Sequence, residues 1–411
     1  MSKRRSRTIS LLLGWVALSI VLAGCWDRLE LEERAVVLGV AIDTADPEAE
    51  EEESPITHLS GRFPVPDERM IRLTVQIAIP GKIPLGPGEG GGGGKGESGQ
   101  TVWVIAVTGH TIDDALVNLQ QQVSGRLFYG HLRVIVVSEA VAREGMENLN
   151  DYLRRNSEVR RMAWMMVSQG KAEDLMKATP QLERVPTLYL ISTMDSAVRM
   201  GKLPENYIGM FWSNLSKLGQ EAFLPYVRMR KEQNIEINGL AYFKGEKMIG
   251  KTKPLEIGTY MAIKGLNPAG YRGFVRLERP PGMVTIFATS RRAAMQVRIV
   301  DNEPKFTVRM FTEINLEEKL NSDFDVNSSD VLEEIQRENR KQLAKAAKAL
   351  IEQTQRNGSD IFGFGEYLRA KKPRYWDREV KTPERWQNMY KNVSIEVDVD
   401  SRVRRIGMKA N

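Results

Sequence analysis

Residues 131–170, HLRVIVVSEAVAREGMENLNDYLRRNSEVRRMAWMMVSQG, decide the fold of the N-terminal half of this chain. Residues 131–139 have a continuous apolar centre, which predicts a strand in the interior of a sheet. Residues 147–159 are predicted to form a helix, and residues 160–170 predict another strand. This alternation of strands and helices indicates an α/β-type N-terminal domain that covers about 26–200.

Further strands and a helix are predicted upstream of that stretch. The runs 33–43 and 70–80 predict a buried strand and its partner, and the run 101–109 predicts a third strand. Residues 111–125, TIDDALVNLQQQVSG, predict a helix in which Thr111 is the N-cap and Asp114 completes a capping box.

Two segments between these elements differ in composition. Residues 44–68 are rich in acids and prolines, and residues 81–100, GKIPLGPGEGGGGGKGESGQ, are rich in glycine. Such compositions are typical of solvated, flexible chain that buries little apolar surface. We therefore expect two flexible insertions in the N-terminal domain.

After Asn234 the pattern changes from alternating elements to hairpins and one long helix. A hairpin is predicted over 235–254 with its turn at Lys244–Glu246, and two long strands are predicted within 295–318 around Asp301–Pro304. A helix is predicted to begin at an Asp330/Glu333 capping box and to end at Asn357-Gly358. A short helix that ends near Pro373 and a half-exposed strand over 393–403 complete the prediction. The fold class is therefore predicted to be α+β (mixed α/β).

We predict three domains after an N-terminal signal. The limits are 1–24 for a lipoprotein signal peptide, 25–200 for the N-terminal α/β domain with insertions at 44–68 and 81–100, 201–290 for a small β-rich middle domain, and 291–411 for a C-terminal domain of strands and a long helix.

The beginning of the chain contains the only cysteine of the 411 residues, Cys25. Four positive charges lie within residues 1–10, about 14 apolar residues follow, and Ala23-Gly24 precede the cysteine. This pattern is typical of a lipobox, in which the thiol is alkylated with diacylglycerol and the peptide is cut before it. We predict that Cys25 becomes an S-diacylglycerol cysteine whose amine can also be acylated, for example with palmitate.

Composition excludes several function classes. Without residues 1–24 the formal net charge falls from +6 to +2, because four positive charges lie there, so the sequence predicts no nucleic-acid partner. His58, His110 and His131 are surrounded by no metal-binding or catalytic spacing, and we interpret them as surface or capping residues. We expect no catalytic residue, no cofactor and no metal site.

Three weaker patterns have alternative interpretations. Residues 86–91 fit G-x-G-x-x-G, but more glycine and then a strand follow, so the match is accidental. The acidic run 48–53 is interpreted as solvated chain, with calcium binding as the alternative. The aromatic residues of the C-terminal part are interpreted as core, with a sugar-binding platform as the alternative; they are Tyr375, Trp376, Trp386 and Tyr390.

Four segments together resemble the Ger(x)C family, the lipoprotein C subunits of spore germinant receptors. They are GCWDRLELEERAVVLGVAID (24–43), FYGHLRVIVVSEAVAREGMENLNDYLRRNSEVRRMAW (128–164), INGLAYFKGEKMIG (237–250) and SDIFGFGEYLRAKKPRYW (359–376). The resemblance runs from Cys25 to about Gly407, and the two insertions are longer than the usual connections of that family.

The resemblance implies a non-enzymatic subunit of three mixed α and β domains. It implies a diacylglycerol anchor on the outer surface of the cell membrane, which is the inner membrane of the spore, and partnership with A and B subunits in nutrient-triggered germination. Only Cys25 transfers as a functional residue, and we expect no direct small-molecule binding.

Two other classes of protein could share the predicted anchor. A solute-binding lipoprotein of an ABC importer should consist of βα units throughout, whereas this chain turns to hairpins after residue 234. A lipid-anchored cell-wall hydrolase should carry paired catalytic carboxylates or a zinc-binding set, and the sequence has no such pattern.

Overall fold

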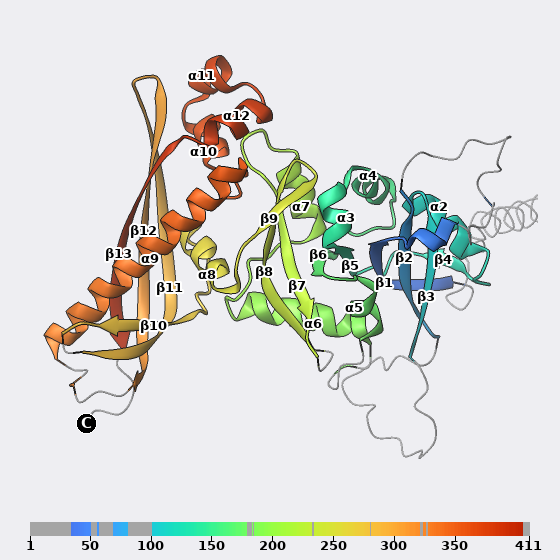
Figure 1. The fold of residues 1–411 in the computed structure, drawn as a ribbon, viewed down its shortest axis with the longest axis horizontal. Coiled ribbons are helices and arrows are strands. Elements are labelled where there is room, and N and C mark those ends of the chain that lie inside the picture. Colours follow the sequence, from blue (N-terminus) through green and yellow to red (C-terminus); the bar gives the residue numbers. More distant parts are fainter. Residues whose placement is uncertain are drawn as a thin grey trace, which may run out of the picture.

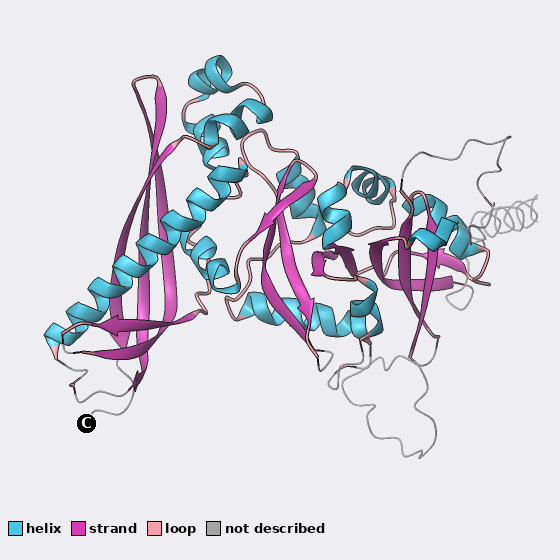
Figure 2. Ribbon diagram, in the orientation of Figure 1, coloured by secondary structure: helices cyan, strands magenta, loops and turns pink. Residues whose placement is uncertain are grey.

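The computed structural model describes residues 34–50, 56, 69–80, 101–178, 183, 185–231, 234–279, 281–320, 324–325 and 328–405. These residues form one sheet of nine strands and one sheet of four strands. The two sheets lie in opposite halves of an elongated molecule, and helix α8 (Pro254–Ile263) lies between them (Figure 1). Both halves contain helices and strands (Figure 2), which confirms the mixed α+β class.

The nine-stranded sheet has the order β3-β2-β1-β5-β6-β7-β8-β9, and β4 pairs with β1. The strands are β1 (Arg34–Thr44), β2 (Ile71–Ala78), β3 (Val102–Gly109), β4 (Arg126–Phe128), β5 (Val134–Ser138), β6 (Trp164–Gln169), β7 (Phe223–Met229), β8 (Ile235–Lys244) and β9 (Lys247–Lys251). Strand β5 lies between β1 and β6 and all its residues are buried, so the prediction of an interior strand is confirmed. The predicted pairing of β1 with β2 is confirmed as antiparallel.

The direction of the strands changes along this sheet. Strands β1, β5, β6 and β7 run parallel, whereas β2 and β3 at one end and β8 and β9 at the other run antiparallel to their neighbours. Crossover connections between the parallel strands need helices, which cover the faces of the sheet. The short helices of this half are η2 (Pro47–Glu50), α2 (Ile112–Gln120), α3 (Glu139–Glu144), α4 (Glu147–Arg155), α5 (Glu173–Lys177), α6 (Pro186–Arg199) and α7 (Ile208–Leu215).

Helix α2 begins at the predicted N-cap, Thr111, but the Asp114 carboxylate bonds His110, one residue before the cap, in place of the Thr111 N–H of the predicted capping box. The Thr111 side chain accepts a hydrogen bond from the Asp114 backbone N–H at 3.1 Å, and the Asp114 carboxylate accepts one from the His110 N–H at 2.8 Å. The first bond satisfies a backbone donor that the first turn of a helix leaves unpaired, and the second fixes the chain just before the cap.

The four-stranded sheet has the order β10-β11-β12-β13. Its strands are β10 (Arg272–Leu277), β11 (Gly282–Val300), β12 (Glu303–Leu320) and β13 (Ser394–Arg405). The long hairpin β11–β12 confirms the prediction of two strands around 301–304, and its turn residues Asp301 and Asn302 have φ values of 53° and 61°. Asp and Asn tolerate this left-handed region better than most residues, which suits a two-residue hairpin turn.

Helix α9 (Ser329–Asn357) runs across the four-stranded sheet (Figure 1). Its predicted end is confirmed, because Gly358 follows in the left-handed conformation with φ 67°. The predicted start is wrong: the N-cap is Ser328, and Asp330 lies inside the first turn. Several adjacent polar residues can serve as a cap, so the local sequence alone does not select one.

The C-terminal helices pack between the two sheets. They are α10 (Phe364–Lys371), α11 (Pro373–Tyr375), the π-helical turn η3 (Trp376–Val380) and α12 (Pro383–Tyr390). A chain of ring contacts connects the sheets through them. Its members are Phe223 of β7, Tyr260 of α8, Phe362, Phe364 of α10 and Phe306 of β12, with successive centroids 5.0, 5.7, 5.7 and 5.2 Å apart.

The residues assigned to a middle domain, 201–290, divide between the two sheets. Strands β7, β8 and β9 continue the sheet of the N-terminal half, whereas β10 and the start of β11 belong to the other sheet. One buried hydrophobic cluster contains residues of both sheets, for example Trp164 and Phe306. The exact limits of the three domains stay a prediction.

Candidate functional site

Several residues of the sequence hypotheses lie outside the described residues. They are the predicted signal peptide 1–24, Cys25, residues 51–53 of the acidic run, His58 and the glycine-rich run 81–100 with its G-x-G-x-x-G match. Polar groups converge at several places in the described chain, and two of them bear on the function. One is the junction between the sheets, and the other is a groove beside α2 and α4.

The junction is built by the segment 359–366, which follows α9. The Ser359 hydroxyl donates to the Phe243 carbonyl at 2.6 Å, and the Asp360 carbonyl accepts from the Glu221 N–H at 2.8 Å. Both partners belong to the nine-stranded half. The end of α9 is therefore attached to β8 and to the chain just before β7.

The Asp360 carboxylate organises the turn that follows. It accepts hydrogen bonds from the N–H groups of Gly363 and Gly365, both at 2.8 Å, and from Trp386 Nε1 at 3.0 Å. Only 1% of the residue is exposed. Burial raises the pKa of the Asp360 carboxyl, the hydrogen-bond donors lower it, and burial has the larger effect, so the pKa is about 6. A buried carboxylate with three N–H donors is an anchor for the backbone.

Close backbone packing explains the glycines of the junction. Gly363 has φ 80°, a region that side chains disfavour. A Cβ on Gly365 would lie 2.4 Å from Trp386 Nε1, so the indole can approach only a glycine. The Glu366 side chain also accepts from the Gly219 N–H at 2.9 Å. The residues that make SDIFGFGEYLR distinctive therefore hold two parts of the fold together.

The C-terminal aromatics are buried in this junction. Trp376, Trp386 and Tyr390 are at most 2% exposed, and Tyr375 is 7% exposed. Trp386 contacts Trp376 and Tyr390 with centroids 5.9 and 6.0 Å apart. The interpretation as core is confirmed, because a sugar-binding platform would need exposed ring faces.

A buried arginine, which the sequence hypotheses missed, links the same region to the four-stranded sheet. Arg291 of β11 is 2% exposed and donates to the carbonyls of Pro268, Gly258 and Gly201 at 2.9, 3.0 and 3.3 Å. Burial lowers its pKa to about 10. The only signal in the sequence is an arginine pair in a strand, and that pattern does not distinguish a buried arginine from an exposed one.

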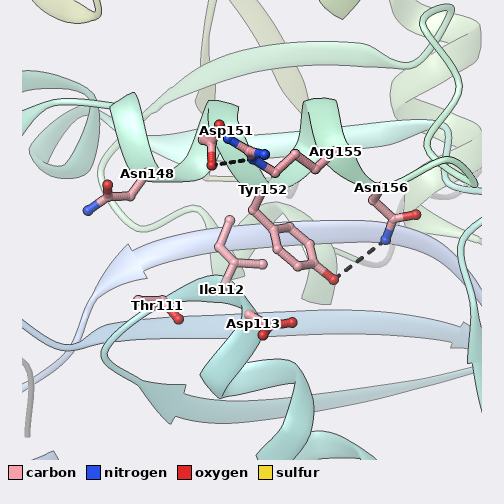
Figure 3. Close-up of a pocket in the computed structure, with 8 residues that line it drawn as sticks. All are labelled: Thr111, Ile112, Asp113, Asn148, Asp151, Tyr152, Arg155 and Asn156. Carbon is pink, nitrogen blue, oxygen red and sulfur yellow. Dashed lines mark hydrogen bonds and ion pairs between the residues drawn. The ribbon is translucent and has the colours of Figure 1, made fainter. Parts of the chain in front are cut away.

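The groove lies between the start of α2 and the length of α4 (Figure 3). Its cavity volume is about 490 Å³, and it is lined by Thr111, Ile112, Asp113, Asn148, Asp151, Tyr152, Arg155 and Asn156. Arg155 forms an ion pair with Asp151 at 2.7 Å one helical turn away, and Asn156 donates to the Tyr152 hydroxyl at 3.5 Å. A second hollow of about 270 Å³ shares Thr111, Ile112 and Asn148 with the first.

The groove offers hydrogen bonds and charges of both signs. Burial raises the pKa of the Tyr152 hydroxyl, so this group stays protonated at neutral pH. The Asp151 carboxylate is ionised and paired, since the hydrogen bond from Arg155 lowers its pKa. Such a surface suits contact with a polar partner, and it contains no nucleophile held by a base.

The histidines of the described chain are not brought together. His110 precedes α2 and its backbone joins the capping arrangement, whereas His131 contacts the edge of the Phe128 ring with centroids 5.9 Å apart. In the described ranges, no cluster of three or more His, Cys, Asp or Glu residues could hold a metal ion.

Of the helices within the described chain, none is both long enough and apolar enough to cross a bilayer.

Two family models match this chain in succession. Residues 27–229 match a model described as spore germination protein N-terminal domain, and residues 238–407 match one described as spore germination B3/GerAC like, C-terminal.

Curated relatives match over almost the same length. The putative spore germination protein YfkR of Bacillus subtilis (strain 168) is 25% identical over 386 residues, which are 92% of this chain and 91% of the relative. Spore germination protein KC of the same organism is 23% identical over 95% of this chain and 94% of the relative. The spore germination protein GerQC of Bacillus cereus is 24% identical over 77% of this chain and 85% of the relative.

A solved structure has a similar fold. The crystal structure of the GerBC protein superposes with a TM-score of 0.53 and covers 83% of this chain and 95% of that one. Its sequence is 15% identical, so the comparison supports the fold alone.

Proposed function

The chain belongs to the family of GerAC-like spore germination proteins, and from this premise we propose that it is a lipid-anchored, non-enzymatic subunit of a nutrient germinant receptor. The observation that carries the proposal is the match of two family models that together span 27–407, nearly the whole chain after Cys25. In this proposal the protein assembles with the A and B subunits of the receptor.

The distribution of polar groups supports a role in assembly. The buried charges Asp360 and Arg291 serve the junction between the sheets, where no substrate could reach them. The groove beside α4 is polar and accessible, and it offers contacts without a reactive group. A protein of this kind works through its surfaces and its position at the membrane.

Membrane attachment through Cys25 is the first testable part of the proposal. We expect the mature protein to begin at Cys25 with a diacylglycerol thioether and to partition into detergent, because two acyl chains at about 0.8 kcal/mol per buried CH₂ hold a protein stably. Cys25→Ser should remain unprocessed or be released from the membrane. Mass spectrometry of the N-terminal peptide checks this, and an unmodified Cys25 in the mature protein would contradict it.

Loss of the gene tests the role in germination. We expect spores without the gene to lose their response to the nutrients that its receptor serves, while germination by exogenous dipicolinate stays intact. Cys25→Ala should give a comparable or partial defect, because tethering raises the effective concentration near membrane partners.

Calorimetry with the purified protein and a germinant panel separates this proposal from a solute-binding lipoprotein. An assembly subunit should give no saturable heat with amino acids, sugars or nucleosides. Saturable micromolar binding by the isolated protein would favour the solute-binding alternative instead.

A further inference from the structure

Strand β13 (Ser394–Arg405) ends the four-stranded sheet, so only one of its sides pairs with another strand (Figure 1). It runs parallel to β12 with an unbroken register from Ser394 to Val403. At 12 residues it is a long edge strand, and such edges are templates for additional strands unless the protein blocks them.

Side chains block both ends of this edge. The Val403 N–H donates to Gln336 Oε1 at 3.1 Å, the Ser401 N–H donates to Asp400 Oδ1 at 2.9 Å, and Gln355 Nε2 donates to the Val393 carbonyl at 2.8 Å. These backbone groups therefore point away from β12.

The middle of the edge is open. Backbone groups of alternate residues point to the same side of a strand, so Ile395, Val397 and Val399 direct their N–H and C=O groups the same way as Ser401 and Val403. Within the ranges that the structure describes, no residue pairs with these groups on that side. The unpaired N–H and C=O groups of these three alternate residues can form the main-chain hydrogen bonds of one short added strand.

The side chains of the open part alternate in character. Ile395, Val397 and Val399 are half-buried against the cluster that includes residues of α9. Glu396 and Asp398 lie on the opposite face and are exposed. The exposed Arg309 of β12 is the register partner of Asp398, on the side away from the open edge. An added strand would thus meet an apolar neighbour on one face and two negative charges on the other.

We propose that the edge Ile395–Val399 binds an extended segment of a partner protein in which apolar residues alternate with Lys or Arg. The apolar residues of that segment would extend the face that packs toward α9, and its cations would lie beside Glu396 and Asp398. The proposal deepens the proposed function, on which it rests, by naming the chemistry of one contact through which the subunit assembles.

A second β13 strand centred on the open part of the edge does not fit it. If two β13 strands paired antiparallel about Val397, Glu396 of each copy would face Asp398 of the other. Like charges directly opposite each other destabilise a strand pair, so the charge pattern selects a basic segment over self-association.

A fluorescent peptide, Lys-Val-Lys-Val-Lys-Val-Lys, tests the edge by anisotropy with the purified full-length protein in detergent. We expect saturable binding of this peptide and no binding of the Glu-Val-Glu-Val-Glu-Val-Glu counterpart. Val397→Pro should weaken binding at least tenfold, because proline removes an outward N–H that β12 does not use. Val397→Thr keeps that N–H and should bind as the unmodified protein does. Equal binding by the proline variant would overturn the proposal.

Charge reversal tests the face beside the edge. The pair Glu396→Lys and Asp398→Lys should bind the acidic peptide instead of the basic one. The control pair Asp377→Lys and Glu384→Lys changes the net charge equally at exposed positions elsewhere and should leave the preference unchanged. A loss of basic-peptide binding in the control pair would mean general electrostatic attraction and overturn the proposal.

Two measurements separate this contact from its alternatives. Sedimentation should give the same mass for the unmodified protein and Val397→Pro, whereas a dimer that only the proline variant loses would identify a second copy and overturn the proposal. A thermal unfolding midpoint close to that of the unmodified protein would verify that Val397→Pro folds. Peptide binding does not depend on the gene-deletion phenotype, so failure of this contact and failure of the proposed function are distinguishable.

Discussion

Asp360→Ala is expected to lower the free energy of unfolding by about 4 kcal/mol at pH 7. The substitution leaves three buried donors, the N–H groups of Gly363 and Gly365 and Trp386 Nε1, without their common acceptor. Each unsatisfied buried donor costs about 1–3 kcal/mol, and alanine also leaves a small void. Urea-induced unfolding followed by tryptophan fluorescence measures the change, since Trp386 of α12 donates directly to the Asp360 carboxylate.

Two further variants calibrate this result. Asp377→Ala removes an exposed aspartate in the neighbouring π-helical turn and should change stability by less than about 0.5 kcal/mol. Asp360→Asn keeps the shape but cannot present two acceptor oxygens to three donors, so we expect a loss smaller than that of alanine. If Asp360→Ala and Asp377→Ala had equal stability, the turn would not depend on the carboxylate.

The pH dependence follows from the same burial. The pKa of Asp360 is raised to about 6 in the folded protein from an ordinary value near 4, so the folded state binds the proton more tightly than the unfolded state. The contribution of this group to stability is therefore fully present below about pH 4 and falls as the pH rises through 6. The difference in stability between the unmodified protein and Asp360→Ala should narrow from pH 4 to pH 7.

Arg291→Lys is expected to destabilise the protein by about 3 kcal/mol, more than Arg291→Met. Lysine keeps a buried positive charge, but its ammonium cannot reproduce the fork that donates to the carbonyls of Pro268, Gly258 and Gly201. Methionine leaves the same carbonyls unpaired, but it removes the free-energy cost of burying a positive charge. The same cost lowers the pKa of Arg291. We expect about 2 kcal/mol for methionine.

The order of the two substitutions is the sharper test. Denaturant unfolding of both variants, with Arg298→Met as the control, measures it, because Arg298 is exposed on the same strand. A lysine variant as stable as the unmodified protein would mean that charge alone is required at this position. A methionine variant less stable than the lysine variant would mean that the charge, and not the fork geometry, stabilises the junction.

The sequence by itself determined many of the helices and strands and several of the residues at which they begin or end. The apolar runs of β1 and β5, the cap at Thr111, the turn at Asp301–Asn302 and the end of α9 at Gly358 are as predicted. These features depend on residues close together in the chain. Their periodicity and backbone preferences can be recognised without knowing which distant residues they contact. The four family segments also pointed to the correct family, while the anchor at Cys25 stays a prediction.

The tertiary structure alone decided which strands share a sheet and which charges are buried. Strands β7–β9 join the N-terminal sheet across a predicted domain boundary, because strand pairing is a choice among distant partners that local pattern does not encode. From the sequence alone, Asp360 and Arg291 would be predicted to lie on the surface, since isolated charged residues are usually exposed. Their burial becomes favourable only where distant backbone groups, the amides near Gly365 and the carbonyl of Gly201, converge on them and replace the water that each charge gives up.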